Sequence, residues 1–101
     1  MGFLSKVFKK GTIIESKQCI HIKSGKIKGY HMGIVNESDK NETIFHIFTH
    51  SKKSNTPVDF SKFSNDFGKK RLDNETYISD KIFKNKTKDI KRPKGGGKYN
   101  V

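Results

Sequence analysis

The sequence has little of what builds long helices and lacks the means for an internal disulfide. Alanine is absent and leucine is scarce, and because these are the strongest helix formers we expect no long regular helices. Cys19 is the single cysteine, which excludes an intramolecular disulfide and fits a reducing compartment. Apolar residues make up only 31%, and no apolar run approaches the roughly 20 residues that span a bilayer. We therefore predict a small cytoplasmic domain.

Acidic residues are also few. The chain has 10 Asp and Glu against 22 Lys and Arg, a formal net charge of +12. Such a charge attracts polyanions, so the predicted partners are a phospholipid or anionic membrane surface, with membrane association, and nucleic acid. An AT-rich genome also encodes Lys, Asn and Ile frequently, so the charge has a purely compositional explanation as well.

Several runs have the pattern of β-strands, because Ile, Phe and Val dominate the apolar residues. The turn residues "SGK" predict a hairpin between 18–23 and the strand that follows. The run "TIFHIFTH" (43–50) is apolar on both faces, which predicts a central place in the sheet. The expected strands are "GTIIESK" (11–17), "QCIHIK" (18–23), "KGYHMGIV" (28–35), "TIFHIFTH" (43–50) and "NETYISDKIF" (74–83).

The remainder of the chain is more polar. Phe60, Phe63 and Phe67 are spaced three and four residues apart, which predicts a short helix or turn packed on the sheet. We divide the chain into an amphipathic lead-in (1–10), a core (11–83) and a basic, Gly-rich tail (84–101) that we expect to be mobile. The predicted fold class is α+β, with a small antiparallel sheet of about 4–6 strands and one or two short helices.

Three of the four histidines lie in two of the predicted strands, 28–35 and 43–50. His31 lies in the first of these strands, and His46 and His50 lie in the second. If the two strands pair across the polar turn 36–42, we expect His31 and His46 on the same side of the sheet. Two adjacent imidazoles could serve as a general base and the group that orients it. The alternative is that each histidine simply makes a local hydrogen bond.

Two further candidate sites have weaker support from the residues. A zinc site from His21, His31, His46 and His50 matches no known ligand spacing, so we predict no metal and no cofactor. Cys19 with His21 is a weak motif, because a thiol in a strand is more often an inert small hydrophobe than a nucleophile.

The order of the motifs resembles the lecithin retinol acyltransferase-like family, a permuted branch of the papain-like superfamily that acts on lipids. The resemblance implies a permuted papain-like version of the predicted α+β fold. It is carried by "KKGTIIE" (9–15), "YHMGIV" (30–35) and "IFHIF" (44–48), and more weakly by "NETYISDKI" (74–82) and "GGGKYNV" (95–101).

By this resemblance, His31 would be the general base for a cysteine thiol and His46 would orient and polarise it. The family's cysteine box would follow Val101, and Cys19 stands in a strand-like run rather than at the helix start used by unpermuted relatives. The resemblance therefore implies a fragment or inactive relative of a cysteine acyltransferase or phospholipase acting on lipid acyl esters, and leaves enzymatic activity open. Self-association is expected if a covering helix is missing.

The alternative is a small basic nucleic-acid-binding protein with structural histidines, which could also contact nucleic acid through its basic tail. A steep loss of affinity with rising salt would distinguish it from the acyltransferase. A third reading is a small basic nuclease that uses His31 and a lysine.

Overall fold

The computed structural model describes residues 7–101, and the first six residues of the predicted lead-in lie outside them. Residues 7–101 form nine strands, two 3-10 helices and one α-helix. In chain order they are β1 (Ile13–Ser16), β2 (Cys19–His21), β3 (Ile27–Lys28), β4 (His31–Ser38), β5 (Glu42–Thr49), β6 (Thr56–Pro57), η1 (Phe60–Lys62), α1 (Phe67–Arg71), β7 (Tyr77–Ile78), β8 (Phe83–Lys86), η2 (Thr87–Asp89) and β9 (Ile90–Lys91).

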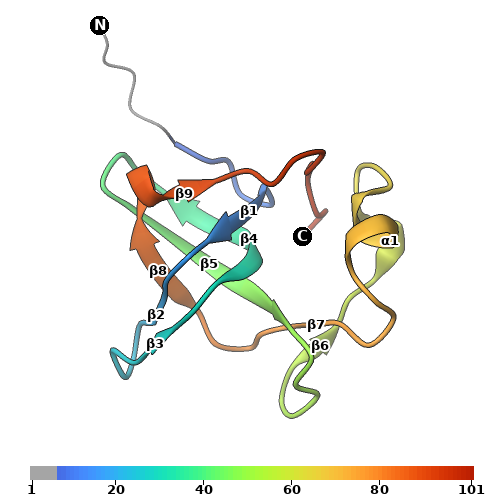
Figure 1. The fold of residues 1–101 in the computed structure, drawn as a ribbon, viewed down its shortest axis with the longest axis horizontal. Coiled ribbons are helices and arrows are strands. Elements are labelled where there is room, and N and C mark those ends of the chain that lie inside the picture. The colour runs from blue at the N-terminus through green and yellow to red at the C-terminus, as the bar shows by residue number, and fades with distance from the viewer. Residues whose placement is uncertain (1–6) are drawn as a thin grey trace, which may run out of the picture.

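The strands form one antiparallel sheet that curls into a half-barrel (Figure 1). Its main order is β3-β2-β8-β5-β4-β1-β9, and the short strands β6 and β7 extend it beside the end of β5. The prediction of a central strand at 43–50 is confirmed, because β5 lies in the middle of this order. The hairpin around "SGK" is confirmed as well, since β2 pairs antiparallel with β3.

The predicted α+β, permuted papain-like fold class is wrong. Strands account for 41% of the residues and helices for 12%, with a single short α-helix. The phenylalanine spacing suggested more helix than forms, because Phe60 belongs to η1, Phe67 opens α1 and Phe63 lies between them with extended backbone. A sheet that curls on itself can bury one of its faces without helices, so little helical cover is needed.

Two hydrophobic cores lie on the two faces of the sheet. The first contains Cys19 of β2 and Ile90 of β9, strands far apart in the sheet order that the curl brings to one cluster. Its buried residues are Phe8, Ile14, Cys19, Val35, Phe45, Ile47, Phe83 and Ile90. The second lies under η1, α1 and the C-terminal residues, and is built from Ile13, Ile34, Phe48, Val58, Phe63, Phe67 and Tyr99.

The segment 84–101, which we expected to be mobile, is part of both cores. Ile90 is fully buried in the first core and Tyr99 is 5% exposed in the second. The ring of Tyr99 meets Phe63 edge-on at 5.0 Å, and its hydroxyl accepts a hydrogen bond from the backbone N–H of Asp59. The glycines and lysines that suggested a loose tail are interspersed with these two apolar anchors.

Gly33 is the position where β4 and β5 approach most closely. A Cβ at Gly33 would collide with the carbonyl oxygen of His46. We predict that Gly33→Ala lowers the free energy of unfolding by about 1–3 kcal/mol in urea denaturation, the usual cost of overpacking. Gly29→Ala is the matched control, because its Cβ would meet nothing within 4 Å, and it should stay within about 0.5 kcal/mol of wild type. Equal stabilities for the two variants would contradict the close approach.

Tyr99 anchors the C-terminal segment. We predict that Tyr99→Ala destabilises the protein by about 3–5 kcal/mol, the range seen when large buried aromatic rings are removed. The exposed neighbour Asn100 hydrogen-bonds through its backbone, so Asn100→Ala should leave thermal unfolding nearly unchanged. If both variants melt at the wild-type temperature, the segment is not held by this ring.

Candidate functional site

The pairing register of β4 and β5 places the two predicted catalytic histidines on opposite faces of the sheet. Ile34 lies directly opposite His46, and Gly33 lies opposite Ile47. Side chains alternate along a strand, so His46 shares the face of Ile34 and the second core. His31 is two residues before Gly33 and belongs to the other face. The expected pair of adjacent imidazoles is therefore not formed.

Each of the two rings has its own backbone partner instead. Nδ1 of His31 lies 3.0 Å from the carbonyl oxygen of Phe48, and Nδ1 of His46 lies 2.8 Å from the carbonyl oxygen of Ser79. Because a carbonyl can only accept, Nδ1 carries the proton in both rings, and Nε2 is left to exchange protons. His46 thus joins β5 to the segment after β7, which is the local role that the alternative prediction gave to the histidines.

The remaining histidines are also dispersed. His21 contacts the hydroxyl of Ser24 in the β2–β3 turn at 2.7 Å, and Nε2 of His50 lies within hydrogen-bonding distance of Oδ2 of Asp73. Within residues 7–101, no group of three or more His, Cys, Asp or Glu is placed to hold a metal ion. In the same part of the chain, no helix has the length and apolar character needed to cross a bilayer.

Cys19 is fully buried in the first core. Burial raises the pKa of its thiol to about 11, even though the backbone of His31 and the nearby Ser16 both favour the thiolate. A nucleophilic cysteine needs the opposite shift, because the thiolate is the reactive form. Cys19 is therefore a packing residue.

We predict a pH dependence of stability from this thiol. The unfolded thiol loses its proton near the ordinary pKa of 9.0, whereas the native thiol keeps it until about 11. Between these values the unfolded state binds fewer protons, so the stabilisation is complete below pH 9 and is lost as the pH rises toward 11. The stability difference between wild type and Cys19→Ala, from urea denaturation, should shrink over this range. A constant difference would contradict the burial effect.

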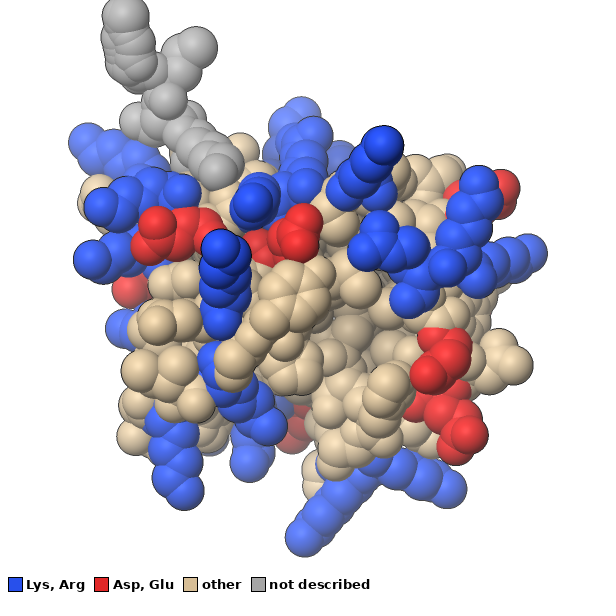
Figure 2. Space-filling model, in the orientation of Figure 1, with Lys and Arg blue, Asp and Glu red and all other residues tan. Residues whose placement is uncertain are grey.

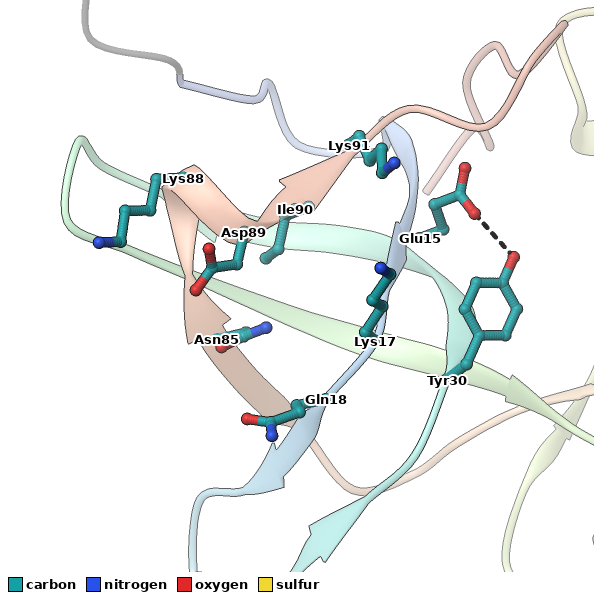
Figure 3. A pocket seen from close by; sticks show the side chains of 9 residues that line it. All are labelled: Glu15, Lys17, Gln18, Tyr30, Asn85, Lys88, Asp89, Ile90 and Lys91. Atoms are coloured by element: carbon teal, nitrogen blue, oxygen red, sulfur yellow. Dashed lines mark hydrogen bonds between the residues drawn. The ribbon is translucent and has the colours of Figure 1, made fainter.

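A cavity of about 520 Å³ runs along β1 and β9. Figure 3 shows its side chains ranged from Lys88 at one end to Tyr30 at the other. Lysines come from three neighbouring segments, and the cavity is lined by Glu15, Lys17, Gln18, Tyr30, Asn85, Lys88, Asp89, Ile90 and Lys91. This set combines cations, an aromatic ring and amides.

Tyr30 is the most distinctive residue of this cavity. Its side chain is 51% exposed, and its hydroxyl donates a hydrogen bond to Oε1 of Glu15 at 2.9 Å (Figure 3). Partial burial and the contact with Glu15 raise the pKa of Tyr30, which keeps the phenol neutral. The hydroxyl is thus fixed while one part of the ring remains accessible.

A second cavity has a volume of about 290 Å³. Tyr30 lines both cavities, and the second one contains His31, His50, Arg71 and Asp73. We call the two cavities together the Tyr30 groove. The polar residues of the second cavity come from the start of β4, the end of β5, the end of α1 and the loop that follows α1.

The surface around the Tyr30 groove is basic. Figure 2 shows Lys and Arg side chains along the upper edge of this face, over β9 and over α1, with fewer Asp and Glu among them. The last turn of α1 alone contributes Lys69, Lys70 and Arg71. On this face, basic side chains therefore come from α1 as well as from the C-terminal segment.

Our reading of the sequence missed most of the Tyr30 groove. Tyr30 is an aromatic residue that follows the alternating "KIKG" run, a pattern of interleaved basic and aromatic residues that could have marked it. Lys17, Lys88 and Lys91 had no such signal, because the strand pairing of β1 with β9 brings them together.

No family model, curated protein or solved structure matches this chain.

Proposed function

We propose that the protein binds single-stranded nucleic acid in the Tyr30 groove. The observation that carries this proposal is a half-exposed aromatic ring, flanked by lysines and shared by two adjoining cavities, in a protein of net charge +12. Proteins that bind single strands combine a basic groove, which follows the phosphates, with aromatic rings on which bases stack.

The roles of the groove residues follow from their chemistry. The ring of Tyr30 is the stacking platform, and its bond to Glu15 limits its rotation, so less entropy is lost on binding. Lys17, Lys88 and Lys91 face the phosphates along the larger cavity. Base recognition falls to Gln18, because the side chain of Asn85 already binds Ser16 and its own neighbour's backbone.

Three carboxylates line the groove, and two of them have partners. Glu15 accepts a hydrogen bond from the hydroxyl of Tyr30, and Oδ2 of Asp73 lies 3.0 Å from Nε2 of His50. Asp89 lines the larger cavity together with Lys17, Lys88 and Lys91. The positive field comes from the surrounding surface, where it raises the local concentration of polyanions and the association rate. A lipid surface fits less well, because the exposed large hydrophobic residues come from separate parts of the chain. They are Val7, Ile22, Ile27, Tyr30 and Val101.

The acyltransferase function stays a prediction of the family resemblance alone. It requires His31 and His46 to act on one thiol, and these residues lie on opposite faces of the sheet.

We predict that Tyr30→Ala weakens binding of a fluorescent single-stranded RNA or DNA, measured by anisotropy, by about 5- to 150-fold. This range corresponds to about 1–3 kcal/mol for one stacked base. Tyr30→Phe is the matched control, because it keeps the ring and loses only the bond to Glu15, and it should bind almost as well as wild type. Equal losses for the two variants would contradict stacking.

The salt dependence tests the lysines in the same assay. Affinity should fall steeply with salt, and Lys17→Gln and Lys91→Gln should each reduce the slope of log K against log salt by about 0.7, the value for one phosphate contact on a single strand. Lys53 lines a different cavity, so Lys53→Gln is the control and should change the slope less. Binding to anionic vesicles but not to single strands would overturn the proposal in favour of a lipid partner.

A further inference from the structure

The second cavity of the Tyr30 groove holds a histidine, a carboxylate and a guanidinium that the binding proposal does not use. Nε2 of His50 lies 3.0 Å from Oδ2 of Asp73. The two side chains are 73% and 63% exposed, and a polar contact at this exposure contributes little to stability. The pair is nevertheless held in a defined geometry. It therefore fits a role in a reaction better than a role in stabilising the fold.

The fixed geometry comes from Asp73. Its Oδ1 accepts hydrogen bonds from the backbone N–H of Glu75 at 3.0 Å and from the hydroxyl of Thr76 at 3.2 Å. Thr76 is buried and also donates to the backbone carbonyl of Asp73. Oδ2 is therefore directed at His50, and it leaves Nδ1 of that ring as the nitrogen that faces a ligand. A histidine whose second nitrogen is bound by a carboxylate is the arrangement of a general base.

The same cavity contains a second imidazole and a cation. His31 lines it and donates through Nδ1 to the carbonyl of Phe48, which leaves Nε2 for proton transfer. Arg71 lines it too, and its guanidinium carbon lies 5.5 Å from the centre of the Phe67 ring, which restrains the side chain. An arginine of this kind suits a phosphate, because it offers several donors in one plane.

We propose that this cavity cleaves RNA bound in the Tyr30 groove, with His50 and His31 as base and acid and Arg71 on the phosphate; the inference rests on the proposed function. Nδ1 of His50 takes the proton from a ribose 2′-hydroxyl. The 2′-oxygen then bonds to phosphorus and the bond from phosphorus to the 5′-oxygen breaks. That oxygen receives a proton from Nε2 of His31, which acts in its doubly protonated imidazolium form and keeps the proton on Nδ1. The products are a 2′,3′-cyclic phosphate and a 5′-hydroxyl, and neither water nor an oxidant is consumed. Asp73 is a positioning residue.

The test uses the full chain with a fluorescent RNA and the same sequence as DNA, with products separated on a denaturing gel and weighed by mass spectrometry. We expect cleavage of the RNA to a cyclic phosphate and no cleavage of the DNA, which lacks the 2′-hydroxyl. His50→Ala should lower the rate by about 10²- to 10⁴-fold, the usual share of a general acid or base. Added imidazole should restore part of it, a rescue that a structural role would not give.

Two further variants define the roles. Asp73→Asn should lower kcat with little change in KM, because the carboxylate orients the base without touching RNA. Lys53→Gln, outside the groove, should cleave at the wild-type rate. Thermal unfolding of each variant checks that the fold is intact. We expect an intact fold, because the side chains of His50 and Asp73 are largely exposed.

The outcomes separate the two proposals. Binding of RNA without cleavage, or cleavage that His50→Ala retains at the wild-type rate, overturns the nuclease inference and leaves the binding proposal in place. Absence of both binding and cleavage overturns both. Cleavage with linear phosphate products overturns the 2′-hydroxyl mechanism.

Discussion

The register between β4 and β5 is the constraint on which the rest of this structure depends. It sets Gly33 opposite Ile47 and Ile34 opposite His46, and the lack of a side chain at Gly33 allows the close approach to the His46 carbonyl. A slip of one residue would turn the side chains of one strand to the opposite faces relative to its partner. The register thus decides which apolar residues enter each core, and it separates His31 from His46.

The curl of the sheet is the second determinant, and polar contacts hold it in place. Asn85 of β8 donates to the hydroxyl of Ser16 in β1, although these strands are not neighbours in the sheet. Thr43 and Thr87 are fully buried and their hydroxyls lie 2.8 Å apart. Since buried polar groups are costly when unpaired, such contacts specify one curvature. This curvature brings β8 towards the paired strands β1 and β9, so that Asn85 lines the larger cavity of the Tyr30 groove together with Glu15 and Lys91.

Tyr30 lines both cavities of the groove, and this gives the two proposals a common geometry. A strand stacked on Tyr30 would have one neighbouring sugar-phosphate beside Lys17 and Lys91 and another beside Arg71. Binding would then position the scissile phosphate, and much of the acceleration would come from that placement. The predicted acyltransferase chemistry has no comparable arrangement, because its nucleophile is not supplied by the buried thiol of Cys19.

The sequence by itself determined the strands and the charge. Apolar residues on both faces of 43–50 specify a central strand, and the turn residues of "SGK" specify a hairpin, because both signals are local. Only the tertiary structure decided the fold class, the burial of the segment 84–101 and the residues that form the site. Three features depend on residues that are distant in the chain. Tyr99 is buried, Lys17 and Lys91 line one cavity, and His50 lies beside Asp73. Spacing in one sequence carries no information on such contacts, because they follow from the curl and register of the whole sheet.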